Sequence, residues 1–462
     1  MSSNGMDHAV VVGGSFAGLV TARVLSDHFA QVTILERDQF PVEPIPRKGV
    51  PQGGHVHGIL KLGREILDDL LPGFVAETTD EGAILFDQIA WGAGWGPNGW
   101  STARGPSKAL GYGVRRPLLE AVARRRVSAI PNIGLAHHKA QGLATSAGRV
   151  TGVLIGDDTG AATVLEADLV VDASGRGSAG PAWLEQAGFE APTDTIVNAF
   201  GGYASKLLRV PDDAWRGDFR FVAQLPTPTC TKGAIVYPQD NGLYIVSLFG
   251  QARDYPPGDE AGFDDFLQNC EISLMHEVVS KSESASEIRT SRATANRWRH
   301  YERIADPPPG FVALGDASMT ANPMFGQGIS TACLGAVTLG DTIGDLEGDL
   351  RTLPKKFQGT LAERIQFPWQ LAVGFDFQFP ETVGERPALT PEAKEAGQYL
   401  RVLGQIATED REVNEAMLLS TQMYDRSRLF EPDFQAKAKA WVAEGRAPRY
   451  TDPKSPPPTL VH

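Results

Sequence analysis

Short apolar runs alternate with helical patterns near the start of the chain. Residues 10–12 are three valines, and residues 32–35 form a second, mostly apolar run. Between them lies a segment with the spacing of a helix, whose apolar positions are Phe16, Leu19, Val20, Val24 and Leu25. Strands that are apolar on both faces are typical of a parallel sheet covered by helices. The pattern therefore predicts a strand–helix–strand unit and an α/β fold.

The pattern changes twice further along the chain. Residues 167–171 are again predicted as a buried strand. Alternating segments at 235–237 and 243–248 predict antiparallel strands instead. Helical patterns at 391–407 and 409–424 follow near the end. The sequence thus predicts an α/β core, an inserted antiparallel sheet and a C-terminal helical region.

Size and composition limit the functional classes. A chain of 462 residues is too long for one ordinary core and suits two or three domains. Its net charge of −13 argues against a nucleic-acid or anionic-membrane partner. Because no run of about 20 apolar residues is present, we expect no transmembrane segment, and the polar N-terminus shows no signal peptide. Three separated cysteines without a C-x-x-C motif favour a reducing, cytoplasmic setting.

A glycine-rich turn, GGSFAG at residues 13–18, joins the first strand to the first helix. Gly13 would make the tight turn, and Gly18 would let the helix pack close to the strand. Glu36 ends the second strand, about 20 residues further on, where an acid accepts from ribose hydroxyls. Ser15 stands where a glycine is usual, and its backbone N–H can still donate to a phosphate. These features favour a dinucleotide-binding unit over a merely structural strand–helix–strand unit.

The stretch from Phe311 to Leu339 places a carboxylate beside a helix N-terminus. A short buried strand ends at the pair Gly315-Asp316, and a small-residue helix begins at about Ile329. The loop between them contains Pro323, Gly326 and Gly328. A helix N-terminus carries roughly half a positive charge and is a ready anion site. We therefore expect an anionic ligand at this loop.

These motifs resemble the FAD signatures of the FAD-dependent monooxygenase superfamily, which includes flavoprotein aromatic hydroxylases and epoxidases. The second signature matches at Gly315, Asp316, Ala317, Pro323, Gly326 and Gly328. Most hydroxylases carry a His soon after Gly-Asp-Ala, whereas this chain has Ser318 and Met319. This departure and the run RKGVPQGGHVH at residues 47–57 resemble the bacterial epoxidase branch acting on polyketide-type substrates, which also includes FAD-dependent (4+2) cyclases.

The resemblance implies a Rossmann-like, three-layer FAD-binding domain that is discontinuous in sequence, made of residues 1–75, 105–180 and 291–350. Residues 76–104 and 181–290 would form an antiparallel β-sheet domain that floors the substrate pocket. Residues 351–462 would form the C-terminal helical region. FAD binding is expected at Gly13, Ser15, Phe16, Ala17, Gly18, Glu36, Arg37, Arg47, Arg116, Asp316, Pro323, Gly326 and Gly328.

Basic residues of two segments carry part of this expectation. In the family an Arg in the segment that runs past the flavin contacts the cofactor, which points to Arg47. An Arg at the start of a later helix reaches FAD; Arg116 fits, and Arg115 is the alternative. His55 and His57 are expected to be hydrogen-bonded side chains near the cofactor, because no third ligand stands near them to complete a metal site.

Two aromatic segments leave alternatives open. Trp91, Trp95 and Trp100 lie on a glycine-rich stretch and could wall a lipophilic pocket or pack one domain on another. Residues 369–387 are aromatic and rich in turns. We expect this second segment to cap the pocket, with core packing as the alternative.

The resemblance implies that FAD carries the chemistry and that no side chain acts as a catalytic nucleophile. NADPH or NADH, bound transiently, would reduce the flavin, and a flavin hydroperoxide would transfer one oxygen atom to an alkene or ring of a bulky lipophilic substrate. The alternative is a redox-neutral cyclase with structural FAD. Two departures from the family pattern favour keeping this alternative: Met319, and the pair Asp172-Ala173 where the family's third signature has Asp-Gly. A non-catalytic flavin-binding protein is the third class, and the lack of a Trp-x-Trp-x-Ile stretch disfavours a halogenase.

Overall fold

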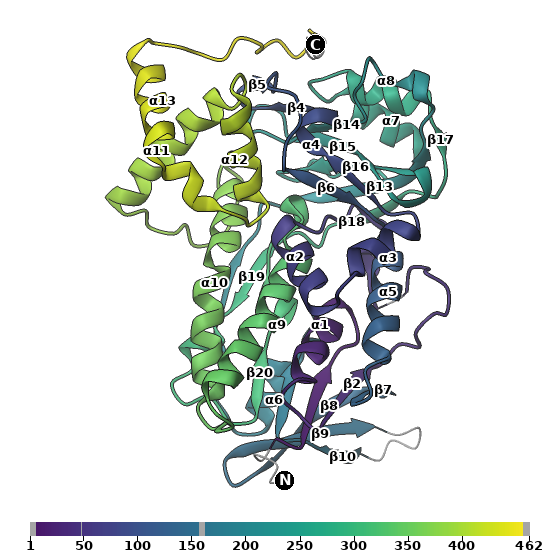
Figure 1. Cartoon of the computed structure of the whole chain (residues 1–462), viewed down its shortest axis with the longest axis vertical. Coiled ribbons are helices and arrows are strands. Elements are labelled where there is room, and N and C mark those ends of the chain that lie inside the picture. Colours follow the sequence, from purple (N-terminus) through teal and green to yellow (C-terminus); the bar gives the residue numbers. More distant parts are fainter. Residues whose placement is uncertain (1–5, 48, 157–161, 456–462) are drawn as a thin grey trace.

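The structure is a computed structural model that describes residues 6–47, 49–156 and 162–455 (Figure 1). A parallel sheet in the order β20-β11-β1-β2-β7 occupies the lower half of the view in Figure 1. Its strands are β1 (His8–Val12), β2 (Gln31–Glu36), β7 (Ile133–His137), β11 (Leu169–Asp172) and β20 (Phe311–Ala313). The parallel sheet predicted from the apolar runs is confirmed.

Both faces of the parallel sheet are covered, which explains why its strands are apolar throughout. Ala9 and Val11 of β1 face the main core, where helices pack. Val10 and Val12 face a second core, built with a small antiparallel sheet in the order β10-β9-β8. The covering elements are α1 (Phe16–Leu25), α2 (Lys61–Leu70), α5 (Arg116–Ser128), α9 (Gly328–Asp345), β8 (Ala140–Ser146), β9 (Arg149–Gly156), β10 (Ala162–Glu166) and α6 (Gly180–Gln186). The core therefore has three layers, as predicted.

Helix α10 (Leu353–Asp376) runs beside α9 and closes the main core. Its buried positions recur every four residues, at Leu353, Phe357, Leu361, Ile365, Trp369 and Val373. The first part of the aromatic segment 369–387 thus packs in the core, the alternative to capping a pocket. Among the described residues, no helix combines the length and apolar character needed to cross a membrane.

A second, larger sheet lies in the upper half of Figure 1, in the order β17-β13-β16-β15-β14-β4-β5, with β18 also paired to β13. Its pairs are antiparallel except for β4 with β14. Helices α7 (Glu260–Gln268) and α8 (Leu274–Ser280) cover one face. The strands are β4 (Gly92–Gly96), β5 (Gly99–Trp100), β13 (Gly202–Arg209), β14 (Phe221–Gln224), β15 (Lys232–Pro238), β16 (Tyr244–Gly250), β17 (Glu283–Ser284) and β18 (Arg289–Ser291). We call it the substrate sheet, after the role expected for it.

Smaller elements connect these two sheets. Strands β12, β19 and β21 form a short sheet, and β3 pairs with β6. Their bounds, with those of the remaining short helices, are α3 (Phe74–Asp80), β3 (Ile84–Asp87), α4 (Gln88–Trp91), β6 (Leu110–Gly113), β12 (Asp194–Val197), β19 (Asn296–Arg299) and β21 (Met319–Thr320). One-turn helices are η1 (Pro51–Gly54), η2 (Asp212–Ala214), η3 (Asp240–Gly242), η4 (Tyr301–Arg303), η5 (Gly315–Ala317), η6 (Pro323–Phe325) and η7 (Arg426–Phe430).

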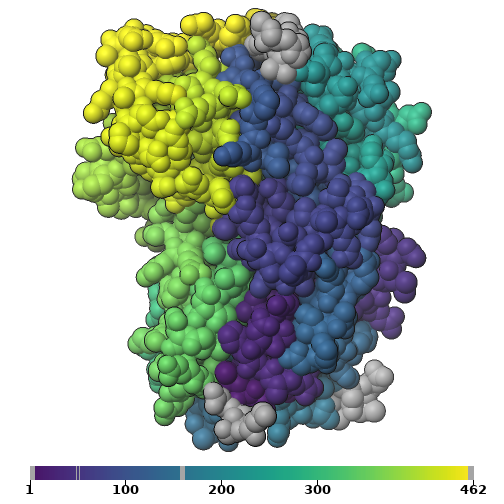
Figure 2. All heavy atoms as spheres, viewed as in Figure 1, coloured from purple at the N-terminus to yellow at the C-terminus, as the bar shows by residue number. Residues whose placement is uncertain are grey.

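The C-terminal helices form a separate cluster on the upper left of Figure 1. They are α11 (Pro391–Ile406), α12 (Arg411–Thr421) and α13 (Pro432–Ala443), which bury Leu403, Ile406, Val413, Phe434 and Trp441 together. Figure 2 shows this C-terminal part, in yellow, against residues near position 100. The backbone N–H of Trp100 donates to the carbonyl oxygen of Tyr450 at 2.9 Å. The predicted C-terminal helical region is confirmed.

A buried ion pair joins the substrate sheet to the α/β core. Asp240, in η3 between β15 and β16, is fully buried. Its Oδ1 accepts the backbone N–H of Arg115 at 2.6 Å, and its Oδ2 accepts Nε and Nη2 of the same arginine at 2.9 and 2.7 Å. The pair fixes the N-terminus of α5 against the substrate sheet.

Replacing Asp240→Ala removes an acceptor that satisfies four donors, three on Arg115 and the side-chain amide of Asn241. We expect the free energy of unfolding to fall by about 2–4 kcal/mol, because the Arg115 donors lose a charged partner. Arg125→Ala is the control, since Arg125 pairs with Glu77 and Glu81 while its side chain is half-exposed, and such pairs contribute less than about 1 kcal/mol. Urea unfolding of the three proteins measures the difference; equal effects of both substitutions would contradict the assignment.

Candidate functional site

The glycine-rich turn between β1 and α1 is sterically closed to larger residues. Gly13 has a φ of 108°, and a Cβ atom there would lie 2.6 Å from the carbonyl oxygen of Ala173, just past β11. A Cβ atom on Gly18 would lie 1.7 Å from the carbonyl oxygen of Gly13. Both positions therefore require glycine, and the turn lies directly against the third signature.

Glu36 closes this turn from the end of β2. Its buried carboxylate accepts the backbone N–H of Gly14 and that of Asp38, each at 3.0 Å. Two backbone donors hold the carboxylate in one orientation beside the N-terminus of α1. This is the place at which an acid binds ribose hydroxyls in a dinucleotide fold.

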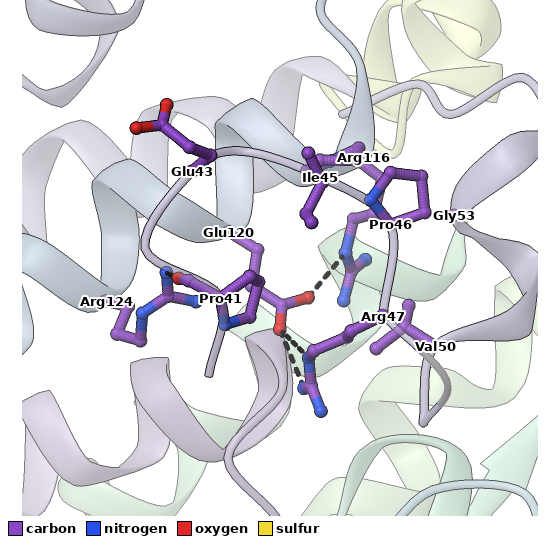
Figure 3. A pocket seen from close by; sticks show the side chains of 11 residues that line it. Pro41, Glu43, Ile45, Pro46, Arg47, Val50, Gly53, Arg116, Glu120 and Arg124 are labelled. Carbon is purple, nitrogen blue, oxygen red and sulfur yellow. Dashed lines mark hydrogen bonds and ion pairs between the residues drawn. The ribbon is translucent and has the colours of Figure 1, made fainter. Parts of the chain in front are cut away.

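A buried cluster of charges lies at the same helix N-terminus, with Glu120 between two arginines (Figure 3). Glu120 accepts from Nε of Arg47 at 2.7 Å and from Nε of Arg116 at 3.3 Å. Arg116 also donates through Nη2 to Ser15 Oγ at 2.9 Å, and Arg47 donates through Nη1 to Glu36 at 3.2 Å. The structure thus brings residues of three separate sequence segments into one charge cluster, which we call the arginine cluster.

The arginine cluster is balanced in charge. Burial works against the charge of Arg47, but the carboxylates of Glu120 and Glu36 outweigh it and raise its pKa. Glu120 was not predicted, although its position four residues after Arg116 on α5 is a signal for an ion pair. Guanidinium groups are the usual donors to phosphate, and the cluster gathers those of Arg47 and Arg116 at the N-terminus of α1.

Asp316 of the second signature faces three arginines. Burial raises the pKa of Asp316, while Arg176, Arg116 and Arg299 oppose that rise. The adjacent Gly315 packs on α1, because a Cβ atom there would lie 3.2 Å from the Cβ of Ala17. The carboxylate is therefore close to the arginine cluster, as the convergence of the two signatures requires.

The loop before α9 presents polar groups that no side chain in the described part of the protein satisfies. No side chain caps α9, so its first backbone N–H groups are available. Gln327, the residue before α9, is 1% exposed, yet neither Oε1 nor Nε2 of its amide has a partner. A buried unpaired amide is costly, so a bound ligand or water is needed to satisfy it. Gly326, with a φ of 63°, turns this loop beside the backbone of Gly58.

An open cavity of about 650 Å³ lies between residues 45–55 and β18 of the substrate sheet. Its lining residues are Ile45, Pro46, Arg47, Val50, His55, Arg289 and Thr290. This volume is within the range of small-molecule sites. A narrower cleft beside it is lined by Arg47, Arg116, Glu120 and Arg124 among others (Figure 3). The arginine cluster thus borders both cavities.

The two predicted histidines are hydrogen-bonded side chains. His55 Nδ1 lies 2.9 Å from Ser205 Oγ, which lies 2.7 Å from Ser247 Oγ. Burial and the nearby Arg289 lower the pKa of His55. Burial lowers the pKa of His57 to about 3, and its Nδ1 bonds the carbonyl oxygen of His55 at 3.0 Å. Both are neutral near pH 7, and no group of residues in the described chain could hold a metal ion.

Successive side chains along a strand of the substrate sheet point to opposite faces of the sheet. Trp95 and Trp100 pack on the face covered by α7 and α8, with ring centroids 5.3 Å apart. Trp91 instead stacks on Phe86 at 5.5 Å, on the opposite face, where Tyr237 lies 5.1 Å from Phe86. Of the three tryptophans, Trp91 therefore lies on the face where the pocket is expected. Trp95 and Trp100 instead pack between the sheet and helices α7 and α8.

Most of the expected cofactor residues lie in two neighbouring groups. The first surrounds the N-terminus of α1 and comprises Gly13, Ser15, Phe16, Ala17, Gly18, Glu36, Arg47, Arg116 and Asp316. The second is the loop with Pro323, Gly326 and Gly328. Arg37 is outside both, because it is exposed and forms no hydrogen bond or ion pair with a described residue. Arg115 is engaged by Asp240, which leaves Arg116 as the arginine at the cluster.

Sequence reasoning missed a buried polar network behind the loop. Asp376, at the end of α10, is 0% exposed. Its Oδ1 accepts from Asn322 Nδ2 at 2.9 Å, and its Oδ2 accepts from Asn296 Nδ2 at 2.6 Å. Asn322 Oδ1 in turn accepts the hydroxyl of Tyr203 at 2.7 Å. The network joins α10, β19, the loop and β13, which are far apart in sequence.

The network makes stability depend on pH. Burial raises the pKa of Asp376 from 3.8 to about 6, against the opposing hydrogen bonds of Asn322 and Asn296. Tyr203, whose own pKa is raised by burial, is the titratable partner facing this network. Because the pKa is raised in the folded state, the protonated carboxyl favours folding, and this contribution is lost as pH rises through about 6.

We expect the free energy of unfolding of the wild-type protein to lose about 3 kcal/mol from this group between about pH 4 and pH 7. The substitution Asp376→Asn removes the titration. Urea unfolding of both proteins across this range measures the two slopes. Parallel pH profiles would show that Asp376 does not titrate in this window.

Two curated proteins resemble the chain over most of its length. Protein Rv3254 of Mycobacterium tuberculosis is 31% identical over 379 residues, which cover 78% of this chain and 77% of that protein. Kynurenine 3-monooxygenase of Salinispora tropica is 25% identical over 358 residues, which cover 73% and 72%. No family model matches the chain. The relationship therefore rests on similarity to individual proteins, which in these two cases spans 78% and 73% of this chain.

Solved structures share the fold at lower identity. A flavoprotein/dehydrogenase from Cytophaga hutchinsonii has a TM-score of 0.65 at 16% identity, covering 95% of this chain and 100% of that one. The flavin-dependent halogenase CmlS has 0.62 at 18%, covering 92% and 78%. The Diels-Alderase PyrE3 of pyrroindomycin biosynthesis has 0.60 at 17%, covering 91% and 81%. The chain belongs to the family of Protein Rv3254, and it shares its fold with flavin-dependent halogenases and other flavoproteins.

Proposed function

We propose that this protein is an FAD-dependent monooxygenase that transfers one oxygen atom to an alkene or ring of a lipophilic, polyketide-type metabolite. One observation carries the proposal. The first nucleotide signature bonds the buried arginine cluster through Ser15, the third packs against its Gly13, and Asp316 of the second is influenced by Arg116. The cluster borders an open cavity beside β18. Similarity to a kynurenine 3-monooxygenase supports a monooxygenase.

The residues present fit FAD. Glu36 would hold the ribose, because its carboxylate is already oriented by two backbone donors. Arg47, Arg116 and the N-terminus of α1 would hold the pyrophosphate. The unpaired amide of Gln327 and the uncapped N-terminus of α9 offer polar partners to the flavin ring. We therefore assign the cofactor to the space between α1, α9 and residues 45–58.

FAD, when bound and reduced, supplies the activated oxygen that no side chain can supply. The protein would contribute position and electrostatics. The N-terminus of α9 would stabilise negative charge at the pyrimidine end of the ring. On the facing side of the substrate sheet, Phe86 and Tyr237 are buried in an apolar cluster on which Trp91 packs. His55 is neutral and fixed by Ser205, so it can orient a polar group of the substrate.

The reductant would be NADPH or NADH, bound transiently. In the described chain, the strand–helix–strand unit at β1, α1 and β2 is the site with a dinucleotide turn, and the proposal gives it to FAD. Asp172 of the third signature is fully buried and accepts hydrogen bonds from the backbone and hydroxyl of Ser174. The Asp172 carboxylate thus stabilises the turn after β11 and is not free to bind a nicotinamide. A nicotinamide would therefore dock on surface residues.

A redox-neutral cyclase remains the second candidate. The Diels-Alderase PyrE3 shares the fold, and a cyclisation needs neither a reductant nor oxygen. In that case the aromatic surface and His55 would hold the substrate in a folded shape. Halogenases share the fold as well, but no residue arrangement described above favours that reaction.

The first test is anaerobic mixing of the FAD-loaded protein with NADPH or NADH, with polyene extracts as candidate substrates. We expect bleaching of the flavin that reverses when oxygen is admitted, because the monooxygenase cycle alternates oxidised and reduced flavin. Absorbance near the flavin band follows the change. FAD that stays oxidised while a substrate is still converted would establish the cyclase, and a protein that binds no FAD would remove both candidates.

The second test uses the turn glycine. Gly18→Ala forces a methyl group into the 1.7 Å gap to Gly13, so the turn must open. We expect FAD affinity to fall at least about 10-fold, measured by quenching of flavin fluorescence. Gly344→Ala is the control: it lies on α9 with open space around its Cβ position, and it should leave affinity unchanged. Equal affinities of both variants would contradict FAD binding at this turn.

A further inference from the structure

The Asp376 network is directional, and its direction is set by the carboxylate. Both oxygens of Asp376 act as acceptors, so Asn322 and Asn296 must each point their Nδ2 donors towards it. Their Oδ1 atoms are then turned away and free to accept. A carboxylate is the side chain of this size that offers acceptors on both sides.

The freed amide oxygens hold the loop. Asn296 Oδ1 accepts the backbone N–H of Asn322 at 2.6 Å. Asn322 Oδ1 accepts the backbone N–H of Met324 at 3.3 Å and the hydroxyl of Tyr203 at 2.7 Å. The carboxylate therefore fixes, through two amides, the backbone of the loop that begins at Asn322.

The same helix end contacts the loop through apolar side chains. Phe375, next to Asp376 on α10, packs edge-on against Phe325 of η6 with ring centroids 5.4 Å apart. Apolar contact alone would hold the loop against α10 without setting its hydrogen bonds. The buried carboxylate, for which the described residues provide no ion-pair partner, is thus present at an electrostatic cost.

We propose that Asp376 is a positioning residue of the flavin site: by orienting Asn296 and Asn322 it sets the backbone of residues 322–326 and couples that loop to Tyr203 of the substrate sheet. The inference rests on the proposed function, because it takes this loop to lie against FAD. It assigns a role to the C-terminal end of α10, which carries no nucleotide signature.

An amide at position 376 breaks the direction of the network. In Asp376→Asn one of the two acceptors becomes a donor, so it faces the Nδ2 group of Asn322 or Asn296. Rotating the side-chain amide would relieve this conflict but create another. A rotated Asn322 would point its Nδ2 donors at the N–H of Met324, and a rotated Asn296 would point them at the N–H of Asn322. One buried donor is left unpaired in either arrangement, which is costly.

Exchanging the two groups restores every bond. With Asp376→Asn and Asn322→Asp together, the new amide donates to the new carboxylate and still accepts from Asn296. The second oxygen of the carboxylate at 322 accepts from Met324 N and from the Tyr203 hydroxyl. Asn322→Asp alone instead places two carboxylates together, which can coexist only when one is protonated.

The experiment compares the wild-type protein, both single variants and the double variant for FAD affinity by fluorescence quenching. We expect each single variant to bind FAD at least about 10-fold more weakly at pH 8, the equivalent of about 1.4 kcal/mol. The double variant should return to within about 3-fold of the wild-type protein. Asn322→Asp alone should regain affinity as pH falls to about 6, whereas Asp376→Asn alone should not.

Melting temperatures of the apo-proteins separate positioning from general stability. Trp441→Ala, which disturbs the cluster of C-terminal helices, is the control that should lower the melting temperature and leave FAD affinity unchanged. Single variants that melt lower but bind FAD like the wild-type protein would overturn the inference, as would a double variant no better than the singles. If the wild-type protein itself bound no FAD, the proposed function would fail instead.

Discussion

The arginine cluster is the constraint on which the site depends. Arg47, Arg116, Glu36 and Glu120 carry four charges inside a protein, and charges out of water must be paired. Each charged group therefore fixes its neighbours. Glu120 accepts from both arginines, and Glu36 accepts the backbone N–H of Gly14 in the turn after β1. The pairing gathers the guanidinium donors of Arg47 and Arg116 at the N-terminus of α1. Charge pairing and hydrogen bonds therefore help to hold residues 41–47 against α5.

Features set by local spacing were predicted from the sequence. The strands β1, β2 and β20, the helix α1 and the start of α9 each follow from a short apolar or helical pattern beside a glycine turn. Gly13 and Gly18 could be assigned because their role is a close approach between adjacent elements, visible in spacing alone. The same logic placed the loop of Pro323 and Gly326 before α9.

Features set by long-range contact could not be predicted in the same way. Nothing local distinguishes Asp376 from an exposed carboxylate, and its partners Asn322, Asn296 and Tyr203 are 54 to 173 residues away. Arg37 is adjacent in sequence to Glu36 but exposed, because successive residues leaving a strand point to opposite sides. Its expected contact with FAD stays a prediction. Glu120 could be predicted in part. The sequence shows that it lies four residues after Arg116, which suggests an ion pair, but it does not show that the pair is buried.

The face of the substrate sheet turned towards residues 53–58 is where this chain's specificity would reside. Proteins named as a flavin-dependent halogenase and a Diels-Alderase share the fold, so substrate selection depends on side chains particular to each chain. Here that face has an apolar end, with Phe86 and Trp91, and a polar end, with Tyr203, Ser205 and Ser247. A substrate that is lipophilic along its length and polar at one point matches this division.

Since Tyr203 also belongs to the Asp376 network, the polar end and the cofactor loop cannot move independently. Substrate and cofactor would therefore share one rigid reference, set by a carboxylate that contacts neither.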